Sequence, residues 1–499
     1  MTTTQADVAA VSASGSQDNP HHAQRWLILA VLGVAQLMVV LDATIVNIAL
    51  PSAQLDLGFS NDSRQWVVTA YALAFGSLLL LGGRVGDLIG RKRVLLIGLV
   101  GFAAASAIGG AANGFGMLVF ARALQGMFGA LLAPAVLSLL TTTFTDAKER
   151  GKAFAIYGAI AGTGGAIGLL LGGALTEYLD WRWCMYVNVL LAVVACAGAS
   201  TFLRHQRAAE RPKLDVPGTL TVTAGLFGLV FGFSHAETDG WHAAGTWGWL
   251  LVGAVMLVTF VALQTRVSHP LLPLRIVLDR GRGGSYLAVF VLGIGMFGVF
   301  LFLTYYLQQS LGFTPIISGI AFLPMIFSLM IGATTATTML LPRVGPRPLV
   351  SVGMVLGALG MLWLGRLTVD SSYASGVVGP LILLGLGIGI SMAPSMNTAT
   401  AGVAPHDAGV ASAMVNTAQQ VGGSIGTALL STVAATAASD FVAGKTVSPL
   451  VQAQAAVESY TTAFAWIAVM FAIGAVVCGL VLPGGVVETD PDAAPAAHL

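Results

Sequence analysis

Hydrophobic positions in this chain gather in long stretches that are separated by short polar connections. Each stretch holds about 20 mostly apolar residues, the length that an α-helix needs to cross a bilayer. The pattern therefore predicts an all-α integral membrane protein with fourteen spans. The expected spans are 26–50, 65–83, 94–113, 116–140, 153–176, 183–203, 216–235, 246–265, 285–309, 314–341, 348–365, 375–399, 408–435 and 461–482.

Lysine and arginine are concentrated in alternate connections between these spans. With the N-terminus placed in the cytoplasm, 18 of the 23 Lys and Arg residues fall on the cytoplasmic side. Cytoplasmic loops are enriched in basic residues, so this split predicts that both termini are cytoplasmic. It also supports the count of fourteen spans, because a missed span would scramble the asymmetry. The exceptions are Arg64, Arg182, Arg366 and Lys445 outside, and Arg122 within a span.

Composition supports a membrane protein and excludes other classes. The chain of 499 residues is 56% hydrophobic and 9% charged, with a mean hydropathy of +0.84, whereas soluble domains carry about 25% charged residues. A net charge of +1 gives no basic field for nucleic acid. Cys184, Cys196 and Cys478 lie in or beside apolar runs, without the spacing of a metal cluster. We interpret them as small apolar fillers and expect no metal site.

The connections between spans are too short for a soluble catalytic domain, so we expect no enzyme activity. The longest connection, about 436–460, is predicted to lie outside. No Walker A pattern is present, because Ser439 stands where the first glycine before Gly444-Lys445-Thr446 belongs. Uphill transport would then depend on an ion gradient and need no cofactor. Residues 1–25 are expected to form a disordered cytoplasmic tail, and 483–499 a short acidic one.

Two opposite charges lie within the apolar runs, Asp42 in 26–50 and Arg122 in 116–140. A charge in hydrocarbon costs at least about 2.5 kcal/mol, so one that is retained is a functional candidate by default. Each of these two charges can stabilise the other. The pair indicates a membrane transporter that handles protons.

The cytoplasmic connection after the second span has the pattern G-x-x-x-D-x-x-G-R-K. Its glycines allow a tight turn, and its aspartate can cap a helix or pair with an arginine. The alternative is an ordinary basic loop with turn glycines. The candidate gating residues are Gly83, Asp87, Gly90, Arg91 and Lys92.

This loop resembles the signature loop of the major facilitator superfamily, although Leu88 stands where that family usually has a basic residue. Further motifs are similar to those of the 14-helix drug:proton antiporters. They are Leu41-Asp42-Ala43-Thr44-Ile45-Val46-Asn47-Ile48-Ala49-Leu50-Pro51, Trp66-Val67-Val68-Thr69-Ala70-Tyr71, Arg122-Ala123-Leu124-Gln125-Gly126, and Trp181-Arg182-Trp183 followed by Asn188.

The resemblance implies two six-helix bundles with a midplane site between them. We expect the bundles to be 26–203 and 267–482, with two extra spans in 204–266 linking the halves. We expect the protein to act as a monomer, with membrane lipids as its surroundings.

The fifth span carries small residues at a spacing of four, which allows two helices to approach backbone to backbone. It resembles the antiporter motif G-x-x-x-G-P-x-x-G-G, but Leu169 replaces the proline, so we expect a straighter helix. The alternative is tight packing without a transport role. The glycines concerned are Gly158, Gly162, Gly164, Gly168, Gly172 and Gly173.

The thirteenth span carries three amides, Asn416, Gln419 and Gln420. They can face a substrate cavity or bond neighbouring helices, and the sequence favours neither reading.

Asp42 and Arg122 are predicted to lie at similar depth, about 12 Å and about 9 Å below the outer ends of their spans at 1.5 Å per residue. The resemblance implies that the first and fourth spans both line the central cavity, so contact, or linkage through Gln125, is expected, with Thr44 and Asn47 as supporting polar groups. Burial favours the neutral acid and Arg122 favours the carboxylate. Movement of Arg122 would then switch proton binding at Asp42. The alternative is a static ion pair that fixes packing.

The motif and the span count favour proton-driven efflux of amphipathic drugs, antibiotics or dyes across the cell membrane. The cavity is expected to hold substrates that are neutral or carry one positive charge. Two other readings stay open. One is a proton-coupled transporter of a lipid, metabolite or nutrient, and the other is a receptor that has lost transport.

Overall fold

The computed structural model describes residues 24–60, 63–144, 146–203, 215–401, 403, 407–446 and 448–485. Within these ranges all regular structure is helical, and fourteen helical segments are long and apolar enough to cross a membrane. The predicted fold class and span count are confirmed. The location of the termini stays a prediction.

The first nine spans are single helices. They are α2 (Arg25–Leu57), α3 (Gln65–Ile89), α4 (Arg91–Gly110), α5 (Phe115–Thr143), α6 (Ala147–Tyr178), α7 (Trp183–Phe202), α8 (Val216–Asp239), α9 (Ala244–Gln264) and α11 (Arg280–Tyr305), the last of which is preceded by the short α10 (Leu274–Val277) and continued by a π-helical turn, η2 (Tyr306–Ser310).

The later spans are more broken. The tenth consists of α12 (Pro315–Ala321), α13 (Leu323–Thr335), η3 (Ala336–Leu340) and α14 (Leu341–Val344); the others are α15 (Pro346–Leu364), α16 (Tyr373–Gly376) with α17 (Val378–Thr400), α18 (Ala408–Val442) and α19 (Pro449–Val481).

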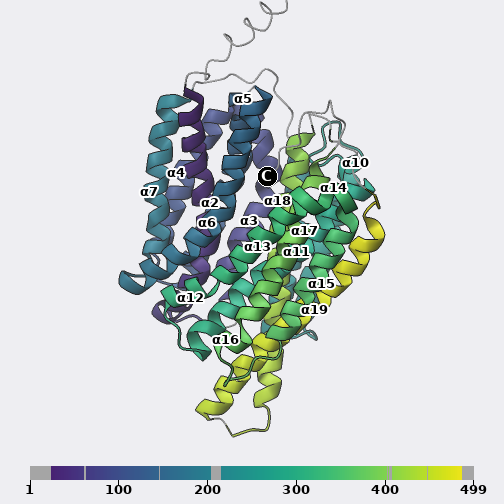
Figure 1. The fold of residues 1–499 in the computed structure, drawn as a ribbon. Coiled ribbons are helices and arrows are strands. Elements are labelled where there is room, and N and C mark those ends of the chain that lie inside the picture. Colours follow the sequence, from purple (N-terminus) through teal and green to yellow (C-terminus); the bar gives the residue numbers. More distant parts are fainter. Residues whose placement is uncertain are drawn as a thin grey trace, which may run out of the picture.

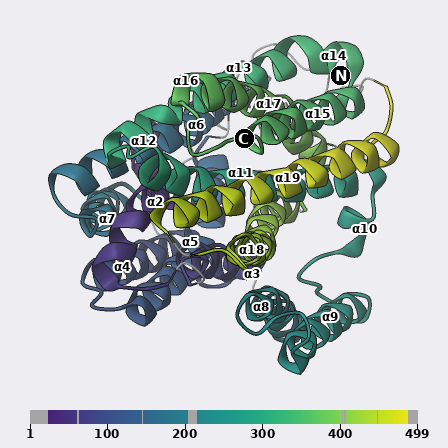
Figure 2. The same cartoon turned by 90° about the horizontal axis from the view of Figure 1, so that it is seen from below.

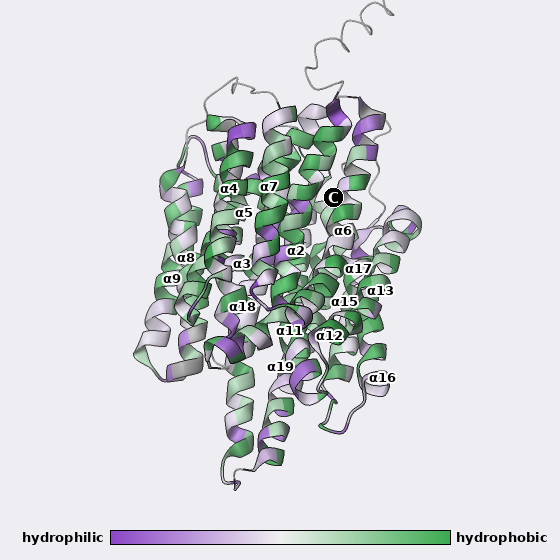
Figure 3. Cartoon of the chain, turned by 90° about the vertical axis from the view of Figure 1, so that its left-hand side faces the viewer, coloured by the Kyte–Doolittle hydropathy of each residue, from purple (hydrophilic) through white to green (hydrophobic). Residues whose placement is uncertain are grey.

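Helices α2–α7 form one bundle and α11–α19 form the other (Figure 1). The hairpin of α8 and α9 lies to one side, next to α3 and α18 (Figure 2). Thr432 of α18 donates to the Phe233 carbonyl of α8 at 2.9 Å, and the rings of Trp66 and Phe231 lie 5.9 Å apart. Hydrophobic residues cover most of the spans (Figure 3). The outer face of α9 is apolar, with Leu251 and Val258 exposed, as a lipid-facing helix requires.

The expected loop at 436–460 is wrong, because helix occupies most of it. α18 continues to Val442 and α19 begins at Pro449. The residues 433–438 are rich in alanine, the strongest helix former, although their hydropathy is modest. Ser448 accepts a hydrogen bond from the Val451 amide and Pro449 occupies the first helical position, so the start of α19 is well capped.

The glycines of the fifth span lie where α6 crosses α2. A side chain at Gly168 would overlap Thr44 Oγ1, and one at Gly172 would come within 2.8 Å of Ile45. Gly164 faces Val40 in the same way. Because α6 carries Leu169 in place of proline, it runs unbroken through this crossing.

The remaining glycines of the motif differ in their surroundings. Gly173 faces the other bundle, where a Cβ atom would lie 2.5 Å from Ile316 Cα. Gly158 is half-buried, and the surroundings of Gly162 lie outside the described residues. The structure thus shows close packing for four of the six glycines, and a transport role for them stays a prediction.

Polar contacts join the two bundles at the end where α2 finishes and α3 begins, which we call the far end. Tyr305 Oη donates to Gln54 Oε1 at 2.5 Å, and Gln308 Nε2 donates to the Ile48 carbonyl at 3.0 Å. The Ile316 amide donates to Glu177 at 3.1 Å. The charge asymmetry predicts that this end faces outward. These contacts close the far end between the bundles.

Arg64 adds a cation–π contact to the closed far end. The guanidinium of this buried residue lies 4.0 Å from the centre of the Tyr305 ring, with Phe302 at 5.8 Å and Tyr460 at 5.9 Å. All three rings belong to the second bundle, whereas Arg64 precedes α3 of the first. A desolvated contact of this kind contributes about 2 kcal/mol.

We expect Gly168→Val to destabilise the protein by about 1–3 kcal/mol, because an overpacked helix crossing must move apart. Gly165→Ala is the matched control, since its Cβ would lie 4.0 Å from Thr44 Cγ2. Unfolding temperature in detergent measures both. Equal stability of the two variants would show that this crossing tolerates separation.

We expect Arg64→Gln to populate a conformation that is open at the far end, by up to roughly thirtyfold if about 2 kcal/mol is lost. Spin labels at the exposed positions Leu55 and Leu450 report the separation of the bundles. The control is Arg366→Gln, which removes an exposed arginine from the second bundle. A distance distribution that stays the same in Arg64→Gln would refute the role of this contact.

Candidate functional site

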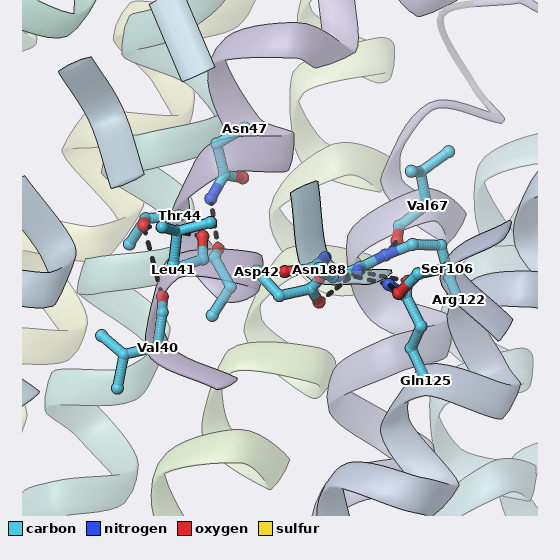
Figure 4. A network of polar contacts seen from close by, with 11 residues as sticks. Val40, Leu41, Asp42, Thr44, Asn47, Val67, Ser106, Arg122, Gln125 and Asn188 are labelled. Atoms are coloured by element: carbon cyan, nitrogen blue, oxygen red, sulfur yellow. Dashed lines mark hydrogen bonds and ion pairs between the residues drawn. The ribbon is translucent and has the colours of Figure 1, made fainter. Parts of the chain in front are cut away.

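The site is built around Asp42, in the middle of α2 and fully buried (Figure 4). Its Oδ2 atom accepts a hydrogen bond from Arg122 Nη1 at 2.6 Å. Its Oδ1 atom accepts two more, from Gln125 Nε2 at 2.8 Å and from Asn188 Nδ2 at 2.7 Å. A carboxylate only accepts, so three donors directed at these oxygens suit a carboxylate at this position.

Arg122 is held by groups from three other residues as well as by Asp42. Its Nε atom donates to the Val67 carbonyl of α3 at 2.9 Å, and its Nη1 atom donates to Gln125 Oε1 at 2.8 Å. The guanidinium carbon lies 4.5 Å from the centre of the Tyr71 ring. Planar, delocalised and weakly hydrated, a guanidinium suits such a buried, multiply bonded position better than an ammonium does.

Gln125 lies one turn after Arg122 on α5 and joins the two charges. It donates to Asp42 and to Ser106 Oγ of α4, the second bond at 2.8 Å. Its carbonyl oxygen accepts from Arg122. Five helices, α2, α3, α4, α5 and α7, thus supply the polar groups of this network.

Sequence reasoning identified Asp42, Arg122 and Gln125, and the structure brings these three together. It did not identify Ser106, and it recognised Asn188 only as part of a motif, without a role. Both are fully buried polar residues within otherwise apolar spans. That isolation is the signal that could have found them, since a buried polar group needs a partner.

Thr44 and Asn47 do not support Asp42, and that expectation is corrected. Thr44 Oγ1 donates to the Leu41 carbonyl at 3.1 Å, and Asn47 Nδ2 donates to the Ala43 carbonyl at 2.9 Å. Both side chains therefore donate to carbonyl groups of their own helix. They lie apart from the Asp42 network in Figure 4. A place in a substrate cavity stays a prediction for them.

The three amides of α18 are only half-buried. Asn416 Nδ2 donates to the Ser412 carbonyl at 3.2 Å, and Gln419 Nε2 lies 3.6 Å from Met296 Sδ. Gln420 packs near Gly76 of α3, and its Oε1 atom has no partner among the described residues. None of these contacts decides between substrate binding and helix packing.

The signature loop reduces to one residue between two helices. α3 ends at Ile89, α4 begins at Arg91, and Gly90 adopts φ +95°, a conformation that favours glycine. Lys92 Nζ donates to the Ser200 carbonyl at 3.0 Å and to Leu203 O, which caps the end of α7.

Other members of this loop are less defined. Gly83 lies near Pro134, because a Cβ atom at Gly83 would lie 3.7 Å from the Pro134 Cβ atom. Arg91 is half-buried at the start of α4. The side chain of Asp87 lies outside the described residues. A gating role for the loop stays a prediction.

We expect Arg122→Gln to destabilise the protein by about 3–5 kcal/mol, because it leaves Asp42 as an uncompensated buried charge. Adding Asp42→Asn removes that charge, so the double variant should recover much of the loss. Thermal unfolding in detergent near pH 8 measures the cycle. As a control, Arg182→Gln breaks a pair with Asp56 that is partly exposed and should cost at most about 1 kcal/mol. A double variant no more stable than Arg122→Gln alone would contradict this account.

Comparison with known proteins identifies the family. Residues 32–427 match the model of the Major Facilitator Superfamily. A puromycin resistance protein of Streptomyces alboniger is 48% identical over 490 residues, 98% of this chain and 96% of that protein. A cephamycin export protein of Amycolatopsis lactamdurans is 39% identical, covering 85% of this chain and 88% of the relative.

A solved structure shows the same fold at low sequence identity. A POT family peptide transporter in an auto-inhibited state matches 92% of this chain and 96% of its own, with a TM-score of 0.65 and 16% identity. With fourteen spans and relatives named for drug resistance and export, the chain belongs to the major facilitator superfamily and matches its 14-helix drug-export branch.

Proposed function

We propose that this membrane transporter exports amphipathic, drug-like molecules from the cell in exchange for protons. The observation that carries the proton part is the buried network of Asp42, Arg122, Gln125 and Asn188. An ionised acid at this depth is costly to bury, so one that is retained is a functional candidate. Such acids commonly form proton relays in transporters. The drug part rests on relatives named for puromycin resistance and cephamycin export.

In the proposed cycle, Asp42 changes its protonation as the bundles rock about the midplane site. The far end is closed and the Asp42 carboxyl group accepts three hydrogen bonds, and in this proposal that arrangement is assigned to a transporter that has released its proton. When the far end opens, Asp42 takes up a proton from outside. Arg122 then loses its charged partner but keeps its contacts with the Val67 carbonyl and the Tyr71 ring. Closing the far end returns the proton to the cytoplasm.

Each proton that crosses contributes about 2.3 kcal/mol per 100 mV in addition to the pH term. Among the described residues, Asp42 is the only acid that lies deep within a span. This favours about one proton per cycle. In this proposal the polar groups of α18, with Asn416, Gln419 and Gln420, contact the substrate. The transporter works as a monomer surrounded by lipid.

The experiment is transport into liposomes under an inside-acid pH gradient, with a fluorescent cationic dye. The wild-type protein should move the dye in a gradient-dependent way, and Asp42→Asn should lose that movement while staying folded, because its amide cannot carry a proton. Asp56→Asn is the control, since Asp56 lies near the end of the same helix and is 45% exposed.

Full gradient-driven transport by Asp42→Asn would assign Asp42 a structural role and leave Asp87 and Asp407 as the carriers to test. An absence of dye movement in the wild type would contradict export of cationic drugs and favour a lipid or a neutral metabolite as substrate.

A further inference from the structure

Asn188 is a member of the Asp42 network in which one polar atom of the side-chain amide is bonded and the other is not. It lies on α7 and is fully buried. Its Nδ2 atom donates to Asp42 Oδ1 at 2.7 Å, but its own Oδ1 atom has no partner among the described residues. A buried carbonyl without a partner is costly and calls for an explanation.

The other amide in the network is locked. Gln125 Oε1 accepts from Arg122, which can only donate, and Gln125 Nε2 donates to both Asp42 and Ser106. Turning this amide over would bring two donors against each other at Arg122. Gln125 therefore keeps one orientation whatever the protonation of Asp42, whereas nothing of this kind fixes Asn188.

We propose that Asn188 reports the protonation state of Asp42 by reversing its hydrogen bond. When a proton binds Asp42 Oδ1, that oxygen becomes a donor, and the Asn188 amide turns about its Cβ–Cγ bond so that its carbonyl accepts. An N–H···O bond is replaced by an O–H···O bond, and no covalent bond in Asn188 breaks. The proton binds Oδ1 because Oδ2 faces Arg122 Nη1.

The geometry makes this reversal nearly balanced. In either orientation one polar atom of the amide faces Asp42 and the other has no partner, so the cost of the unpartnered atom is similar in both. The protonation of Asp42 then decides the orientation. Asn188 is thus a positioning residue. Its amide N–H stabilises the ionised acid and its carbonyl stabilises the neutral one, so the change in the protonation of Asp42 becomes a change in the orientation of a side chain on α7.

Few other groups near Asp42 can titrate. Among the described residues, the charged or titratable side chains that face it are Arg122 from α5, Tyr71 from α3 and Cys184 from α7. Arginine stays charged, and phenols and thiols ordinarily keep their protons below about pH 8. A change in Asn188 below about pH 8 would therefore report Asp42.

The transport consequence rests on the proposed proton exchange, but the hydrogen-bond reversal does not, so it is tested without transport. Infrared titration of the full-length protein in lipid nanodiscs follows the carboxylic acid band of Asp42, assigned by its loss in Asp42→Asn. The amide carbonyl band of Asn188, assigned by its loss in Asn188→Leu, should shift with the same midpoint.

We expect Asn188→Leu, which keeps the volume but removes the donor to the carboxylate, to raise the Asp42 midpoint by about one pH unit, a tenfold gain in proton affinity. Asn188→Ala should do the same and covers the case in which leucine does not fold. Asn188→Ser, whose hydroxyl both donates and accepts, should return the midpoint toward that of the wild type.

The matched control is Ser106→Ala. Ser106 is equally buried and belongs to the same network, but it bonds Gln125 rather than Asp42. The Asp42 midpoint in Ser106→Ala should therefore stay near the wild-type value. The proposal is overturned if the midpoint in Asn188→Leu and Asn188→Ala does not move, if the Asn188 carbonyl does not follow Asp42, or if Asp42 shows no titration. A reversal that occurs as described in a protein without proton-driven transport would overturn the proposed function alone.

Discussion

The burial of one ion pair constrains the whole first bundle. Placing Asp42 and Arg122 together in hydrocarbon removes both from water, and their mutual attraction repays that only if further hydrogen bonds satisfy the remaining polar atoms. One partner cannot supply them. The carboxylate has three donors, and the guanidinium reaches a backbone carbonyl, an amide and an aromatic face. Those groups come from different helices, so the network exists only where several helices meet closely.

Glycine makes that closeness possible at the site itself. Gly126 follows Gln125 on α5, and a Cβ atom there would overlap the Tyr71 carbonyl of α3. The contact of α5 with α3 brings Arg122 within reach of the Val67 carbonyl, one turn before Tyr71. Gly168 does the same for α6 against α2, next to Thr44. The polar network and the Gly126 crossing are therefore parts of one arrangement, because the ion pair is satisfied only where α5 and α3 lie close together.

The same reasoning explains what the sequence could and could not predict. Spans are predictable because hydrocarbon admits only helices with satisfied backbones, and the charges within them stand out against apolar neighbours. Asp42, Arg122 and Gln125 follow from this. Asn188 received no role, since a lone amide in a span has many ordinary partners and only the fold shows which it uses. Thr44 and Asn47 misled for the opposite reason, because proximity along a helix does not say which way a side chain bonds.

The connection at 436–460 shows a second limit. Hydropathy measures suitability for lipid, and α18 and α19 continue as helices beyond the apolar core, where alanine propensity and the Ser448 cap decide. The contacts that close the far end likewise cannot be predicted from composition. Arg64 reads as one more exterior basic residue, and only the packing of α11 and α19 around it reveals three rings at one guanidinium.

Two helices connect the buried ion pair to the closed far end. α3 begins just after Arg64, which contacts the aromatic rings of the second bundle, and one turn later its Val67 carbonyl accepts from Arg122. α2 carries Asp42 and, about 9 Å further along at 1.5 Å per residue, the Ile48 carbonyl bonded by Gln308 of the second bundle. A change in how Arg122 divides its bonds between Asp42 and Val67 thus acts on helices whose ends hold the bundles together. Coupling requires an element that both sites bias, and the start of α3 is the candidate for that element, because Arg64 contacts the aromatic rings and the Val67 carbonyl, one turn later, accepts from Arg122.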